Sequence, residues 1–164
     1  DPVDMWTAEF YAGVGTKLRQ VVLDEPDMLD PAVLEVLRQA LAQDMGDYYR
    51  KVFERYAFRE RMRAFFDQFD LLISPTLPVA GFDVGLDVPP GYEDRNIVSW
   101  ATFTYPFNLT GQPAASMPVG MTRDGLPVGL QLVAPSYDEA SIFALASGYQ
   151  RAAAWADGRQ PSSS

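Results

Sequence analysis

Residues 103–135, FTYPFNLTGQPAASMPVGMTRDGLPVGLQLVAP, decide the expected fold of this chain. Glycine and proline are so frequent in this stretch that neither a long helix nor a long strand fits between them. Two apolar runs of strand length remain, Ala114–Met121 and Val128–Ala134, and turn residues join them at Thr122–Gly125. We therefore predict a hairpin, with Pro127 at the entry of its second strand, where a missing N–H is tolerated.

The residues before this stretch predict helices and one more strand. Leu71–Ser74 is a short unbroken apolar run, which predicts a strand buried on both faces. With the hairpin, it predicts an α/β layered fold in which a parallel or mixed β-sheet is covered by helices. Val79–Asn96 has no sustained period and is rich in Gly, Pro and Asp, which predicts a long loop of the kind that is often functional.

Helical periodicity divides the rest of the chain. Residues 1–69 are predicted to be mainly helical, residues 70–135 to hold strands and loops, residues 136–154 to form a C-terminal helix, and residues 155–164 to form a tail. The expected helices cover Asp4–Val22, Asp30 to a stop at Gly46, Asp47–Phe69, and Ser136 or Asp138 to Ala154. Asp30 followed by Pro31 is a typical helix start.

The composition excludes several classes of partner. The chain has 164 residues, which predicts one domain, and a net charge of −9, which argues against binding nucleic acid or an anionic membrane. We find no apolar stretch of about 20 residues that would span a membrane. The absence of cysteine excludes a disulfide framework and favours a cytoplasmic protein.

The absence of histidine and cysteine also limits the chemistry. A Ser-His-Asp triad, a thiol nucleophile and a thiolate or imidazole metal site are all excluded. Lys17 and Lys51 both lie in predicted helices, far in sequence from a serine-rich turn. We therefore predict no catalytic residue, no metal site and no cofactor in this chain.

Three motifs in order resemble the C-terminal part of the amidase signature family, over roughly residues 47–151. They are Asp70-Leu71-Leu72-Ile73-Ser74-Pro75-Thr76-Leu77-Pro78, the Thr-x-Pro-x-Asn-x-x-Gly-x-Pro-Ala pattern at Thr104–Ala114, and Gly125-Leu126-Pro127-Val128-Gly129-Leu130-Gln131. The resemblance implies the layered fold of that family and hydrolysis of carboxylic amides by a Ser, cis-Ser, Lys triad.

That triad belongs to the N-terminal portion of the family, for which this chain has no counterpart. We therefore expect residues 1–164 to be a C-terminal segment of an amidase domain that is inactive by itself. Its expected partners are a small amide substrate and the missing N-terminal portion, and a homo-oligomer is left open. As a fragment, it should expose a sheet edge and an apolar face.

The resemblance also suggests residues that line the substrate pocket. The candidates are Trp100, Phe103, Thr104 and Phe107, although aromatic residues at such spacing are also typical of a core. Asn108 and Gln131 are expected to be buried amides that satisfy backbone groups. Thr76 and Ser116 are expected to cap backbone groups rather than touch substrate.

Alternative functions stay open at this point. One is a non-catalytic binding or scaffold module, and another is a fragment of the amidase subunit of a tRNA-dependent amidotransferase. In those proteins an acidic residue that helps hold the glutamine amino group aligns with Ala101. Without that carboxylate an ammonium group loses its partner, which favours an uncharged or apolar amide as substrate.

Overall fold

The computed structural model describes residues 1–153, so the predicted tail at 155–164 and the last residue of the predicted final helix, Ala154, lie outside it. The described elements begin with four helices and a 3₁₀ turn: α1 Val3–Lys17, α2 Arg19–Asp24, η1 Pro26–Met28, α3 Pro31–Ala42 and α4 Met45–Phe66. They continue with β1 Leu72–Pro75, α5 Tyr105–Thr110, β2 Ala114–Met121, β3 Pro127–Val133 and α6 Glu139–Ala152.

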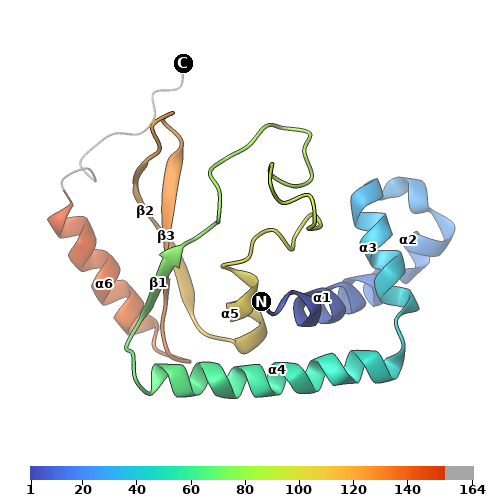
Figure 1. Cartoon of the computed structure of the whole chain (residues 1–164), viewed down its shortest axis with the longest axis horizontal. Coiled ribbons are helices and arrows are strands. Elements are labelled where there is room, and N and C mark those ends of the chain that lie inside the picture. Colours follow the sequence, from blue (N-terminus) through green and yellow to red (C-terminus); the bar gives the residue numbers. More distant parts are fainter. Residues whose placement is uncertain (154–164) are drawn as a thin grey trace.

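Two separate apolar cores lie at the two ends of the molecule. Tyr11, Val22 and Leu37 form the first, between α1, α2 and α3. Leu132 and Ile142 belong to the second, between the sheet and α6. Figure 1 shows α4 running along one side of the molecule from α3 to β1, and this helix contains no fully buried residue. At 1.5 Å per residue it spans roughly 33 Å, so it joins the cores rather than forming part of either.

The helix boundaries follow from the caps. Asp30 accepts hydrogen bonds from Ala32 N at 2.9 Å and Val33 N at 3.4 Å, which confirms the predicted start. Asp44 accepts from Gly46 N at 2.7 Å and so begins α4. The predicted stop at Gly46 is therefore wrong: α3 ends at Ala42, and Gly46 lies in the first turn of the next helix.

The first predicted helix differs from the structure in one respect. Leu18 keeps a hydrogen bond from its N–H to Val14 O at 2.9 Å, but its ψ of 11° leaves the helical range, so α1 and α2 follow each other as two helices. The last helix begins as predicted, because Asp138 accepts a hydrogen bond from Ser141 N at 3.2 Å.

The sheet has the order β1-β3-β2, and both pairs are antiparallel. The predicted hairpin is confirmed: Gly125, with φ of 80°, closes the turn, and Pro127 is the first residue of β3. A bulge interrupts β2 between Pro118 and Gly120. The α/β class is confirmed, whereas the expected parallel pairing is absent among these three strands.

The structure also corrects the prediction that the strand β1 is buried on both faces. Ile73 is 54% exposed, so the strand is not buried on both faces. The physical reason is its position, since β1 pairs only with β3 and forms an edge of the sheet within the described residues. Figure 1 shows α6 along one face of the sheet, while α5 and the long loop lie on the other side.

Candidate functional site

The two faces of the sheet differ in chemistry because side chains alternate along each strand. On one face Met117, Leu130 and Leu132 pack toward Ile142 of α6. Besides Leu72 and Val133, the opposite face carries small and polar residues. They are Ser74, Thr76, Ser116, Gly129 and Gln131, and we call this group the polar face.

Two hydroxyl groups meet on the polar face. The Oγ1 of Thr76 lies 2.6 Å from the Oγ of Ser116. Thr76 directly follows β1 and Ser116 lies in β2, and these two strands are not neighbours because β3 lies between them. Gly129 of β3 makes the contact possible: a Cβ at this position would lie 2.7 Å from the Ser116 hydroxyl and 2.8 Å from the Thr76 hydroxyl. The backbone N–H of Thr76 also donates to Gly129 O at 2.9 Å.

A pocket of about 350 Å³ opens at this hydroxyl pair. Its lining comes from Pro75–Gly81, Ser116 and Pro127–Gly129. These residues include no ionisable side chain, so the two hydroxyls are the polar side chains of the pocket. Such a site suits an uncharged group better than an ion.

Gln131 joins the polar face to the segment that precedes α5. The residue is 4% exposed, and its Nε2 donates to Phe103 O at 2.7 Å and to Ser74 Oγ at 3.1 Å. This confirms that Gln131 is a buried amide that satisfies a backbone group. Thr76 and Ser116 bond each other instead, so the expectation that they cap backbone groups is wrong.

The predicted wall residues Trp100, Phe103 and Thr104 lie in the turns that lead into α5. The Trp100 ring meets Phe82 of the long loop edge to face at 5.4 Å, and its Nε1 donates to Ile97 O at 3.1 Å. Phe103 is 37% exposed, and the Thr104 hydroxyl donates to Ala101 O at 3.0 Å.

The other two residues predicted nearby, in α5, differ in burial. Phe107 is only 9% exposed, which agrees with the alternative that it belongs to the core. Asn108 is exposed, so the expectation of a buried amide there is wrong. Since Tyr105, Leu109 and Thr110 also point inward, Asn108 occupies the remaining side of this short helix.

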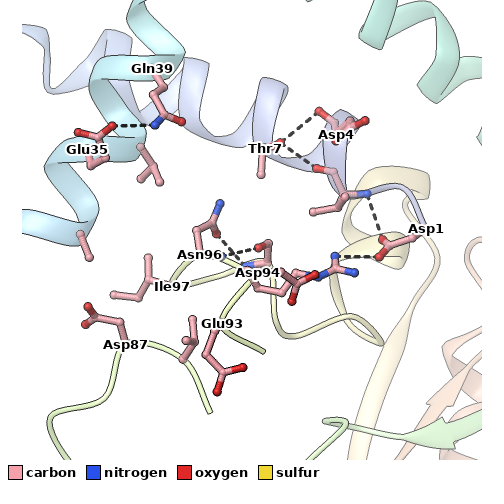
Figure 2. A pocket seen from close by; sticks show the side chains of 16 residues that line it. Asp1, Asp4, Thr7, Glu35, Gln39, Asp87, Glu93, Asp94, Asn96 and Ile97 are labelled. Carbon is pink, nitrogen blue, oxygen red and sulfur yellow. Dashed lines mark hydrogen bonds and ion pairs between the residues drawn. The ribbon is translucent and has the colours of Figure 1, made fainter. Parts of the chain in front are cut away.

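A second, larger hollow of about 840 Å³ lies between α1, α3 and the loop at 87–99 (Figure 2). Carboxylates surround it, and Arg95 forms an ion pair with Asp1 at 2.9 Å. A hydrogen bond from the backbone N–H of Gly91 lowers the pKa of Glu93. Across residues 1–153, however, no group of acidic side chains is close enough to hold a metal ion.

Neither lysine is among the residues that line the two hollows. Lys17 is exposed in the last turn of α1. Lys51 of α4 forms ion pairs with Glu54 at 3.2 Å and Asp4 at 3.9 Å. Within the part of the chain that the structure describes, no helix is both long and apolar enough to cross a bilayer.

Comparisons with known proteins agree with the motifs. The sequence model described as Amidase matches residues 23–143. A glutamyl-tRNA(Gln) amidotransferase subunit from Thermodesulfovibrio yellowstonii is 35% identical over 158 residues, which cover 94% of this chain and 29% of that protein. The putative amidase AmiC of Mycobacterium tuberculosis is 35% identical over 134 residues, or 77% of this chain and 28% of that protein.

Solved structures show the same fold. A 6-aminohexanoate cyclic dimer hydrolase matches with a TM-score of 0.82 at 23% identity, over 98% of this chain and 36% of that one. A structure described as an amidase matches with a TM-score of 0.80 at 26% identity, over 93% of this chain and 35% of that one. The chain thus spans less than two fifths of the length of these relatives.

Proposed function

Because the chain belongs to the Amidase family, we propose that the whole protein hydrolyses carboxylic amides and that this chain builds part of the substrate pocket. The observation that carries the proposal is the uncharged pocket beside the hydroxyl pair, within the segment that matches the family. A small pocket with few polar groups is typical of a binding site for a small organic molecule.

We propose that the reacting groups lie outside this chain. A Ser, cis-Ser, Lys mechanism needs a lysine beside serines. Here Lys51 is held in ion pairs on α4, and Lys17 is exposed at the end of α1. Since relatives are several times longer than this chain, the remaining portion has room for a triad. The isolated chain should then be inactive.

The open sheet is where that remaining portion would pack. β1 and β2 are both edges among the described residues, and Ile73 and Leu77 are exposed beside the β1 edge. Unpaired strand edges and exposed apolar side chains favour association with further structure. We propose that strands and helices from elsewhere in the protein cover this edge.

Trp100, Phe103, Thr104 and Phe107 are not part of the lining of the 350 Å³ pocket, and we propose that they form a further wall of the substrate site in the whole protein. Phe103 is exposed enough to meet a ligand, and Gln131 holds its carbonyl next to the polar face. The substrate that we propose is an uncharged amide, since Ala101 supplies no carboxylate and the pocket has no ionisable lining residue. A cytoplasmic location is part of the same proposal.

Activity of the separated and reunited parts tests this function. We would assay the chain, the N-terminal portion of the same protein and their mixture on 4-nitroacetanilide. Hydrolysis is expected only in the mixture and in the whole protein. Turnover by the chain alone would contradict the proposal that the reacting groups lie outside it.

A second candidate is the amidase subunit of a tRNA-dependent amidotransferase, which the 35% identity to the Thermodesulfovibrio protein favours. Comparing glutamine with 4-nitroacetanilide as substrates of the whole protein decides between the two. Preference for glutamine would favour this second function and would contradict the inference from Ala101.

A further inference from the structure

The hydroxyl pair of Thr76 and Ser116 has an unusual position for a contact between side chains of one sheet. Its two strands are separated by β3, and the side chains reach each other over Gly129. The pair is therefore built from three strands and depends on a missing side chain at the middle one. It also lies in the lining of the 350 Å³ pocket.

The number of protons on the pair determines what it can bind. Each hydroxyl has one O–H and two acceptor lone pairs. Their mutual hydrogen bond at 2.6 Å uses one of the two protons. Neither Oγ atom has a further hydrogen bond with the described residues, so one O–H is left to donate to a ligand. A carbonyl oxygen is the natural acceptor for a single neutral donor.

The surroundings of the pair exclude a charged ligand. No lining residue carries an ionisable side chain, and Leu77, Val79 and Val128 make much of the wall apolar. An ion that entered this pocket would lose water without gaining a counter-charge, which is costly. A carbonyl group next to a short hydrocarbon or peptide-like group loses little hydration energy when it enters the pocket, and it gains one hydrogen bond.

We propose that Thr76 and Ser116 bind a second carbonyl of the substrate, in the acyl portion and distinct from the carbonyl that is cleaved. This inference rests on the proposed function, because it assigns the acyl side of the amide to this pocket. Gly129 is then a specificity-determining residue, since it leaves the space in which the two hydroxyls and the ligand oxygen meet.

A purely structural role is the alternative. A hydrogen bond between side chains of one sheet contributes to stability without any ligand. In that case removal of a hydroxyl would lower the melting temperature and leave substrate preference unchanged. The test therefore compares two ligands of similar shape, of which only one has the amide group that supplies the second carbonyl.

N-acetylglycyl 4-nitroanilide and 4-methylpentanoyl 4-nitroanilide form such a pair, because a methyl branch and a methylene group in the second replace the carbonyl oxygen and the amide N–H of the first. In the whole protein, the double variant Thr76→Val/Ser116→Ala has neither hydroxyl and should raise KM for the N-acetylglycyl substrate roughly threefold to tenfold, the loss of one neutral hydrogen bond. KM for the hydrocarbon substrate should not change. Ser116→Ala and Thr76→Val each keep one O–H and should have a smaller effect in the same direction, and Thr76→Ser should keep the wild-type preference.

Equal changes in KM for both substrates would overturn the proposal. A change in melting temperature with no change in KM would also overturn it. A binding measurement covers the case in which the protein cleaves neither substrate and the proposed function itself fails. Calorimetric titration of the whole protein with N-acetylglycinamide and 4-methylpentanamide should show the same threefold to tenfold discrimination, lost in the double variant Thr76→Val/Ser116→Ala. Binding of neither amide to the wild-type protein would also overturn the inference.

Discussion

The helical region, residues 1–66, and the sheet region, residues 72–152, are stabilised in different ways. The helical region uses an apolar core around Leu37, caps at Asp30 and Asp44, and an ion pair of 2.8 Å between Glu9 and Arg55. The sheet region packs one face against α6 and leaves the other face to small and polar groups. The comparison shows that this chain gives up apolar packing where it forms a pocket.

The largest effect is expected in the helical core. Leu37 has no exposed surface, so Leu37→Ala should lower the free energy of unfolding by about 2–5 kcal/mol. Denaturant unfolding of the variant measures this loss. Leu23→Ala, at an exposed position of α2, is the control and should change stability by less than about 0.5 kcal/mol.

If the two regions play separate roles, Leu37→Ala should leave amide binding by the folded protein unchanged. Binding that weakens together with stability would show that the helical region also shapes the pocket. The same calorimetric titration with N-acetylglycinamide provides this measurement.

Replacing a glycine by alanine sharpens the comparison, because it should change the free energy of unfolding in opposite directions in the two regions. Gly129→Ala places a methyl group against both hydroxyls and should cost about 1–3 kcal/mol of stability. Gly13→Ala in α1 meets no atom within 4 Å and should stabilise the chain by roughly 0.5–1 kcal/mol. Thermal unfolding of both variants checks the signs, and stabilisation by Gly129→Ala would contradict the close packing over the strand.

The smallest effect is expected on the stability of the protein at alkaline pH. Burial raises the pKa of Tyr11 from 10.0 to about 12, and its hydroxyl donates to Asn96 Oδ1 at 3.2 Å. Because the unfolded chain releases this proton first, stability should fall as the pH rises from 10 toward 12. Tyr11→Phe should weaken that fall in unfolding experiments, whereas Tyr137→Phe, at an exposed position, should leave it intact. If stability falls equally steeply with pH in the two variants, Tyr11 is not the group responsible.

Local signals in the sequence predicted much of the fold. The Asp30-Pro31 start, the turn at Gly125 and the entry of β3 at Pro127 depend on residues close together in the chain, so their chemistry is visible without the structure. The burial of Leu71–Ser74 was overestimated, because an apolar run does not reveal whether a strand has neighbours on both sides.

The candidate site was harder to predict than the fold. Gln131 was expected to be buried, but the contact between Thr76 and Ser116 joins residues 40 positions apart across a third strand. One signal was present: a glycine inside a strand pattern, here Gly129, often marks a place where another group comes close. Its partners still depended on the strand order, which the motifs alone do not give.

The bulge between Pro118 and Gly120 has a consequence for how the sheet associates with other chains. Proline lacks an N–H, and the bulge bends the backbone, so the outer edge of β2 offers an interrupted row of hydrogen-bonding groups. A foreign strand cannot add along the whole of that edge. Such an interruption disfavours the open-ended addition of further strands along β2.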